Sequence, residues 1–319
     1  MQELLEIAGN AVRAINPRLL PKPPPGEEET GHDVCFLGPS GEDDYDKVVY
    51  CADLPHGQRG IIGSWYLDPQ RHVIEYFAIS MACFAVIRAV LPTIIKYPEK
   101  KASNLDPPKA FKLLTLVTFI IQVVYKTKGY RGKILFMLMP CNVLWILYFA
   151  ICFLPLRTQT LHIMYQLMIP YAILPVVAVA TPDLSDLVMW LEDTFFFCSH
   201  YALIAYPIYL VCTGRIVMLP ENREGLLQSS FKWWLLSCAI FGFFYFGIIT
   251  PVAIMSGFNL NYMLNPPPNP GDVVSGPHFR LMSIACCAVG FFLSQLVATL
   301  SAVVVGWLFR RRSTKRKNV

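Results

Sequence analysis

Charged residues are scarce in this chain: they make up 15% of its 319 residues, against about 25% in an average soluble domain. Hydrophobic residues make up 55% and gather in long uncharged blocks. The net charge of +5 is small, and no basic stripe with interleaved aromatic residues occurs, so no nucleic-acid partner is expected. The composition therefore predicts a polytopic membrane protein surrounded by a lipid bilayer.

Metal-binding and secretory motifs are missing as well. No CxxC pair and no Cys/His cluster with zinc spacing occurs, so neither a metal nor a cofactor is expected. Eight of the ten cysteines stand in apolar blocks, where free cysteine behaves as a small hydrophobic residue. The first 70 residues lack an apolar core followed by a small-residue cleavage site, so the first span is expected to act as its own insertion signal.

Residues 1–70 form a polar segment with a net charge of −7, which we expect to be lumenal and loosely ordered. It begins with an amphipathic stretch, residues 4–15, that fits a surface helix. Cys35 and Cys51 are the two cysteines outside the apolar blocks. They could form a disulfide if the segment is lumenal, and the sequence leaves this open.

Seven apolar blocks follow, which predicts an all-α helical bundle of about seven transmembrane helices within residues 71–309. The second block is short and needs flanking residues to span, and Pro170 and Pro175 are expected to bend the fourth. Residues 310–319 form a basic tail, predicted to be cytosolic. The blocks are 73–95, 113–125, 134–156, 161–180, 194–212, 231–255 and 281–309.

The third block, residues 134–156, is uncharged and 23 residues long, enough for a helix to cross a hydrocarbon core of about 30 Å. Within it, Pro140, Cys141 and Asn142 place a helix kink, a thiol and an amide side by side. Pro140 has no N–H to donate to the carbonyl of Phe136, so the backbone must find other partners there. Such a break is tolerated where it faces protein or a wet cavity, so we expect this turn to face inward and open a pocket.

Lys and Arg near the spans predict the orientation. With a lumenal amino terminus the cytosolic segments hold 15 of them and the lumenal segments 7, although residues 126–133 count against this orientation. The carboxyl-terminal sequence KRKNV resembles a cytosolic dilysine retrieval signal, which coat proteins bind. A charged flank that stops translocation would explain the tail equally well. We expect a multi-pass protein of the endoplasmic reticulum membrane with a cytosolic carboxyl terminus.

His200 and Cys141 are the residues best suited to chemistry. Ionisable residues inside spans are rare and are functional candidates by default, although a histidine bonded to a neighbouring helix explains His200 alone. Their spans cross in the same direction, and the two residues lie about 9 and 10 Å from the start of their blocks. At this shared depth, near the ester carbonyls of a phospholipid, a histidine would activate the thiol as in any Cys–His pair.

Other polar residues could complete such a site. Asn142 could donate to an oxyanion, and Tyr245 and Gln166 lie on neighbouring spans. Asp193 lies two helical turns from His200 and is too far away to orient it directly. No backbone oxyanion hole is recognisable. The basic residues of 126–133 could hold a lipid phosphate, and a solvated face is the ordinary explanation of such a run.

The chain resembles the transmembrane protein 164 family of multi-span lipid acyltransferases. The resemblance is carried by PCN at 140–142, SHYALIAYPIYL at 199–210, SSFKWWLLS at 229–237 and NLNYMLNP at 259–266. It implies that Cys141 carries the acyl group and that His200 is its partner. The sequence departs from the family at Asn142, where the family tends to have histidine. Family histidines on spans six and seven are replaced by Tyr245 and Cys286.

The resemblance implies phospholipid remodelling: transfer of a polyunsaturated acyl chain, arachidonoyl by preference, from phosphatidylcholine to a lyso ether phospholipid through a cysteine thioester. Phospholipids and lysophospholipids are then the substrates. A lipid hydrolase on the same Cys141–His200 site is the alternative within enzymes. A non-enzymatic seven-span receptor or transporter is the alternative outside them, and the absence of inverted repeats and buried acid clusters disfavours a transporter.

Overall fold

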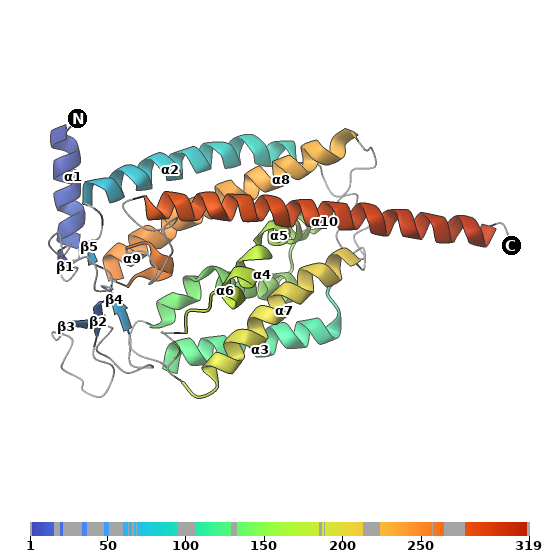
Figure 1. The fold of residues 1–319 in the computed structure, drawn as a ribbon, viewed down its shortest axis with the longest axis horizontal. Coiled ribbons are helices and arrows are strands. Elements are labelled where there is room, and N and C mark those ends of the chain that lie inside the picture. Colours follow the sequence, from blue (N-terminus) through green and yellow to red (C-terminus); the bar gives the residue numbers. More distant parts are fainter. Residues whose placement is uncertain are drawn as a thin grey trace.

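The computed structural model describes residues 2–15, 20–21, 34–36, 48–50, 60–62, 64–65, 67, 69–94, 106–128, 133–184, 187, 189–212, 224–256, 258–264 and 278–317. Most of these residues belong to helices that run along the long axis of the molecule (Figure 1). The helices are α2 (Pro69–Val90), α3 (Lys109–Lys128), α4 (Pro140–Phe153), α5 (Thr158–Tyr171), α6 (Ile173–Ala180), α7 (Glu192–Cys212), α8 (Glu224–Gly242), α9 (Thr250–Ser256) and α10 (Phe279–Lys317). Short 3₁₀ helices η2 (Leu91–Thr93), η4 (Lys133–Leu138) and η6 (Leu260–Tyr262) and the π-helix η5 (Phe243–Ile249) connect or extend them.

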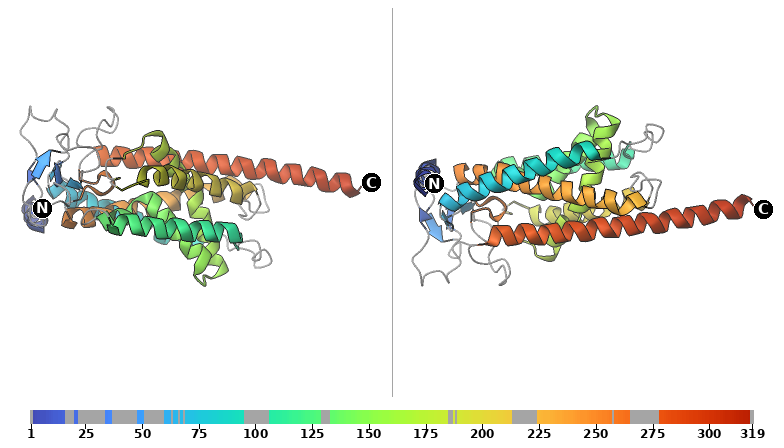
Figure 2. Two further views of the ribbon diagram at one scale, coloured as in Figure 1. Left: turned by 90° about the horizontal axis from the view of Figure 1, so that it is seen from below. Right: turned by 90° about the horizontal axis from the view of Figure 1, so that it is seen from above.

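Within the part of the chain that the structure describes, five helical segments are long and apolar enough to cross a membrane: Gln70–Thr93, Lys109–Lys128, Thr158–Ala180, Gln228–Ser256 and Phe279–Ser301. The predicted all-α membrane bundle is thereby confirmed. Helix α4, at 14 residues, is a shorter apolar helix, and α7 is not among the five, so seven spans remains a prediction. Helix α10 has 39 residues and continues well beyond the other helices at the end opposite the amino terminus (Figure 2).

The fourth block is bent, as predicted. Helix α5 ends at Tyr171, a turn residue follows, and α6 begins at Ile173. The break matches the chemistry of Pro175, which has no N–H to donate to the Tyr171 carbonyl one turn earlier.

The third block differs from the prediction of one helix kinked at Pro140. Residues 133–138 form the 3₁₀ helix η4, and Met139 is extended, with φ −61° and ψ 142°. Pro140 is the first residue of a new helix, α4. Proline is favoured at this position because its missing N–H would have no intrahelical partner there and its φ is already helical. The continuous helix was therefore a wrong prediction.

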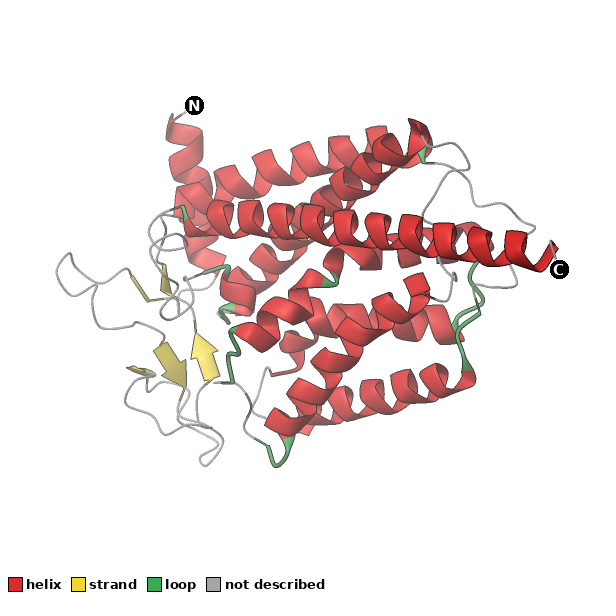
Figure 3. Ribbon diagram, turned by 45° about the vertical axis from the view of Figure 1, so that its right-hand side comes forward, coloured by secondary structure: helices red, strands yellow, loops and turns green. Residues whose placement is uncertain are grey.

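The amino-terminal segment lies at one end of the bundle, where Figure 3 shows the strands separated from the helices. Helix α1 (Gln2–Ile15) covers the predicted amphipathic stretch and packs on α2. Strands β2 (Val34–Phe36), β3 (Val48–Tyr50) and β4 (Gly60–Ile62) form an antiparallel sheet in the order β3-β2-β4, and β1 (Leu20–Pro21) pairs with β5 (Ser64–Trp65) in parallel. These strands were not predicted. Cys51 lies outside the described residues, so its disulfide with Cys35 stays a prediction.

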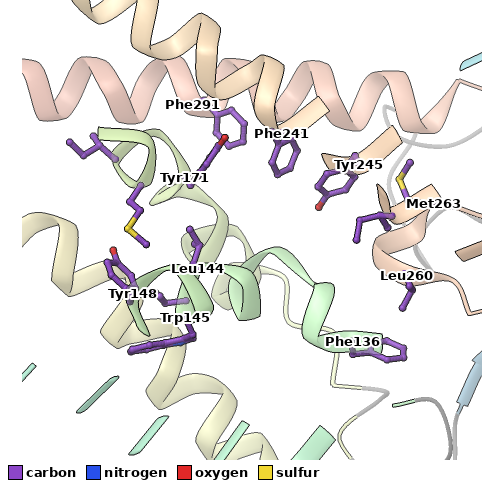
Figure 4. Packing of buried hydrophobic residues seen from close by; sticks show 14 of the residues in the cluster. Phe136, Leu144, Trp145, Tyr148, Tyr171, Phe241, Tyr245, Leu260, Met263 and Phe291 are labelled. Carbon is purple, nitrogen blue, oxygen red and sulfur yellow. The ribbon is translucent and has the colours of Figure 1, made fainter. Parts of the chain in front are cut away.

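The interior of the bundle is rich in aromatic side chains, several of which appear in Figure 4. Trp145 and Tyr148 of α4 are each 1% exposed and pack edge to face. The outer faces of α2 and α10 instead expose large apolar residues such as Phe77 and Val297. This inside-to-outside distribution fits helices that face hydrocarbon, where apolar surface has no need of burial.

Candidate active site

One cavity of about 470 Å³ is lined in part by the first turns of α10, a helix that begins near the bundle end that carries the amino-terminal segment (Figure 1). Its wall is built by the end of α3, the start of α4, α6, the first turns of α7 and α10, η5 and the segment around η6. Cys141, Asn142, His200 and Tyr245, four residues singled out in the sequence, all lie on this wall. Residues 59 positions apart, Cys141 and His200, are thus brought to one space by the fold.

Two other sequence candidates lie elsewhere. Gln166 is 1% exposed and does not line the cavity. Asp193 is exposed, and its Oδ1 accepts the N–H of Thr194 at 2.6 Å, so it acts as a local turn residue. Neither residue contributes to the geometry around Cys141.

The start of α4 places Cys141 at the second position of a helix. Val143 donates the first bond of this helix, 2.9 Å to the Met139 carbonyl. The N–H groups of Cys141 and Asn142 precede that bond and belong to the donors that a helix leaves without intrahelical partners. Thiolates and oxyanions are stabilised at such a helix end. This helix start was not predicted, because a continuous helix would have used those N–H groups internally.

Asn142 supplies a hydrogen bond that Pro140 cannot make. Its Nδ2 donates to the Phe136 carbonyl at 2.7 Å, an oxygen to which the proline has no N–H to donate. The backbone N–H of Met139 reaches the same oxygen at 3.0 Å. Asn142 therefore closes the η4–α4 corner that presents Cys141, and its second amide proton remains for a ligand.

His200 is held in one tautomer. Its Nδ1 lies 2.7 Å from the Phe196 carbonyl, and because a carbonyl only accepts, Nδ1 carries the proton. In a neutral imidazole Nε2 is then the acceptor and can take a proton. The side chain is 6% exposed and its ring packs on Phe196, with the ring centroids 4.0 Å apart. His200 Nε2 is therefore the ring nitrogen that can accept a proton.

Tyr245 belongs to the π-helix η5, a rare helix type that is frequent at functional sites. Figure 4 shows its side chain directed toward the interior of the bundle. Asn261 donates its Nδ2 proton to the Tyr245 hydroxyl oxygen, which leaves the hydroxyl proton to be donated elsewhere. Asn261 and Tyr262 have φ values of 48° and 58°, in the left-handed region. Residues with this strained backbone conformation cluster at functional sites. Asn261 was missed as a site residue, although it lies in the NLNYMLNP stretch.

The remaining wall is largely apolar. Helix α6 contributes Ile173, Leu174 and Val177, and α10 contributes Gly290. A Cβ atom on Gly290 would lie 3.3 Å from Ile173 Cγ1, so the glycine allows α6 and α10 to approach closely. The cavity wall therefore combines polar side chains with an apolar surface.

Comparison with known proteins identifies the family. A family model described as the TMEM164 family matches residues 66–316. The chain belongs to the TMEM164 family. A relative described as "Transmembrane protein 164 homolog", from Dictyostelium discoideum, is 26% identical over 216 residues, which cover 64% of this chain and 74% of the relative. No solved structure matches the chain.

The family match covers all the helices that line the cavity. Three of the four sequence stretches that carry the resemblance also contribute to the wall: 140–142, the histidine of 199–210, and residues 259, 261 and 262 of 259–266. The TMEM164-like segments of this chain are thus far apart in sequence and gather around one space in the fold.

Proposed function

We propose that the chain is a membrane phospholipid acyltransferase in which Cys141 carries the acyl group and His200 is the general base. One observation carries the proposal: a thiol at a helix start and a histidine with its Nε2 set as an acceptor line the same cavity as an apolar wall. A thiol, a base and a place for an acyl chain are what cysteine acyl transfer needs. TMEM164 membership agrees with the assignment but carries no chemistry by itself.

In the first half-reaction His200 Nε2 takes the proton from Cys141 Sγ, and the thiolate attacks the carbonyl carbon of a phospholipid ester. The tetrahedral intermediate collapses as the bond between the carbonyl carbon and the ester oxygen breaks. The leaving lysophospholipid oxygen receives the proton from His200. A thioester on Cys141 and a free lysophospholipid are the products.

In the second half-reaction the hydroxyl of a lysophospholipid acceptor gives its proton to His200 and attacks the thioester carbonyl. The bond to sulfur breaks, and the Cys141 thiolate takes the proton back from His200. Acyl donor and acceptor use the site in turn, which predicts ping-pong kinetics. If water took the acceptor's place, the same residues would make a hydrolase.

Developing negative charge on the carbonyl oxygen requires donors fixed in advance. The N–H groups of Cys141 and Asn142 at the start of α4 and the hydroxyl of Tyr245 are the candidates. Tyr245 is suited to this because Asn261 already donates to its oxygen. Together these donors would form an oxyanion hole, which was not recognisable in the sequence.

The finer substrate assignment rests on the resemblance. It names an arachidonoyl-like polyunsaturated chain, phosphatidylcholine as donor and a lyso ether phospholipid as acceptor. The apolar side chains of α6 supply a wall suited to the acyl chain. Asn142, Tyr245 and Cys286 depart from the family at the cavity itself, so each acyl chain and acceptor must be assayed on this chain.

The proposed location is the endoplasmic reticulum membrane, with a lumenal amino terminus and KRKNV in the cytosol for coat-protein binding. Protease added to sealed microsomes should remove an epitope placed after Val319 and spare one placed before Gln70. The reverse pattern would contradict the orientation. It would leave the Cys141–His200 site intact, because both residues belong to one cavity in either orientation.

Trapping the thioester tests the function directly. Purified protein incubated with phosphatidylcholine and no acceptor should gain one long-chain acyl group on Cys141, found by mass spectrometry of the peptide and removed by neutral hydroxylamine. Adding a lyso ether phospholipid should discharge the group into an ether phospholipid that carries the transferred acyl chain. Discharge into free fatty acid alone would identify a hydrolase, and absence of any acyl group on Cys141 would refute the cysteine mechanism.

A further inference from the structure

Two side chains of opposite charge face the cavity. Of the described residues that line it, Lys126 and Asp183 are the ones with a formal charge. Lys126 lies near the end of α3, and Asp183 follows α6. Charges are expensive to remove from water, so two opposite charges on the wall of a ligand cavity are candidates for recognition of a charged ligand.

Lys126 belongs to a cluster with more ammonium than carboxylate among the described residues. Lys133, which is 0% exposed, donates to Glu192 Oε2 at 2.6 Å, and the Met189 N–H reaches the same oxygen at 3.1 Å. Lys126 Nζ lies 3.7 Å from the other oxygen of Glu192, too long for a hydrogen bond. Lys126 therefore places an ammonium group on the cavity wall, and an ammonium group is well matched to a phosphate.

Asp183 offers the opposite charge. Its Oδ2 accepts the hydroxyl proton of Tyr262, which fixes the carboxylate in place. The rings of Phe136, Phe196 and Tyr262 also line the cavity. A carboxylate and aromatic faces together are the groups that attract a quaternary or primary ammonium.

Phe136 connects this charged region to the reacting centre. Lys126 Nζ lies 5.7 Å from the centre of its ring, and the carbonyl of Phe136 accepts Asn142 Nδ2 at 2.7 Å. Asn142 is the neighbour of Cys141. Lys126 and Cys141 therefore lie on the wall of one cavity and are linked through Phe136 and Asn142.

We propose that Lys126 and Asp183 form the headgroup subsite of this cavity and bind a zwitterionic phosphodiester, with Lys126 on the phosphate and Asp183 on the ammonium group. This assignment rests on the lipid site proposed above and adds a selectivity to it. A phosphate without an ammonium group would meet Asp183 with like charge and bind less well. A lipid with no phosphate would use neither charge.

A binding experiment without turnover tests the subsite. The full chain carrying Cys141→Ala, in detergent micelles, is titrated with lysophosphatidylcholine, lysophosphatidic acid and monoacylglycerol that share one acyl chain. We expect lysophosphatidylcholine to bind most tightly. Adding Lys126→Met should weaken both phosphate-bearing lipids about tenfold or more and leave monoacylglycerol unchanged. Adding Asp183→Asn should weaken lysophosphatidylcholine alone.

Matched controls come from the other end of α3. Lys112 and Asp106 form a pair at 2.8 Å whose members do not line the cavity, so Lys112→Met and Asp106→Asn should leave all three affinities unchanged. Lys126→Arg keeps the charge and should keep most of the phosphate-dependent binding. It distinguishes a lost contact from a misfolded protein.

Equal weakening of monoacylglycerol by Lys126→Met, or equal wild-type affinity for all three lipids, would overturn the subsite. So would a failure of all three to bind. Headgroup-selective binding in a protein that never forms a thioester would uphold the subsite and refute the acyltransferase. Thioester formation without headgroup selectivity would do the opposite.

Discussion

Two groups of buried polar side chains lie near the same end of this bundle, and their hydrogen bonding differs. Between α2 and α10, Glu75 accepts Arg71 Nε at 2.7 Å on one oxygen and Arg280 Nη2 at 2.7 Å on the other. Arg280 Nη1 also reaches His72 Nδ1 at 2.8 Å and the Met263 carbonyl at 3.1 Å. In this ion cluster the charged groups face one another.

In the cavity, three polar side chains that line the wall are each oriented by a protein partner. His200 is held by Phe196, Asn142 by Phe136 and Tyr245 by Asn261. Mutual pairing stabilises a helix contact, whereas single-sided pairing preorganises groups for a ligand. The ion cluster should therefore matter for stability and the cavity for activity, and substitutions in the two groups test this division.

The largest effect is expected at the proposed catalytic pair. Cys141→Ala and His200→Ala should each reduce acyl transfer about 10³-fold or more, and the double variant should be hardly worse, because nucleophile and base act as a unit. Unfolding temperatures in detergent should stay close to wild type. Cys152→Ala and Cys238→Ala, at cysteines that do not line the cavity, should retain transfer of labelled acyl chains to a lyso ether lipid. Full transfer by Cys141→Ala would instead favour the receptor alternative.

Arg280→Met should instead lower the stability of the protein. It leaves Glu75 buried with one fewer cation, and the loss of one partner from a buried ion pair costs about 3–5 kcal/mol of unfolding free energy. Denaturant unfolding in micelles measures this. Arg71→Met should cost less, because the Arg71 side chain is 26% exposed against 1% for Arg280. A stable but inactive Arg280→Met protein would show that the ion cluster is part of the active site.

Tyr245→Phe separates packing by the ring from hydrogen bonding by the hydroxyl, since the ring remains and only the hydroxyl is lost. We expect kcat to fall about 100-fold with KM nearly unchanged, the effect of removing one oxyanion donor. Tyr171→Phe is the matched control, because the Tyr171 hydroxyl donates to the Ser237 carbonyl at 2.8 Å and does not line the cavity. Equal losses in the two variants would point to packing and remove Tyr245 from the mechanism.

The smallest effect is expected for Asn142→Ala. It removes the side-chain donor to the Phe136 carbonyl, which should cost about 1 kcal/mol of stability and lower acyl transfer less than tenfold. Chemical unfolding and initial rates of thioester formation measure both. A loss as large as that of Cys141→Ala would mean that Asn142 touches the substrate and not only the η4–α4 corner.

Much of the arrangement around Cys141 could be predicted because hydrophobicity is a local property and because successive spans cross the membrane in alternating directions. Uncharged blocks of membrane length mark helices, and odd-numbered blocks run in one direction, which placed Cys141 and His200 near one end. The error at 134–156 has an equally local cause: proline is compatible both with a kink inside a helix and with the first turn of a new one. Composition does not distinguish these two cases.

The sequence by itself determined the membrane environment, the helical segments, the bend near Pro175 and the candidate pair Cys141 and His200, because these follow from apolar length, proline chemistry and residue type. Only the tertiary structure decided that Asn261 orients Tyr245, that Lys133 and Lys126 meet Glu192, and that Asp183 faces the cavity. Tyr245 and Asn261 are 16 positions apart in the sequence, and Asp183 and its partner Tyr262 are 79 positions apart. Their formation depends on how the helices pack, which no local pattern of residues specifies.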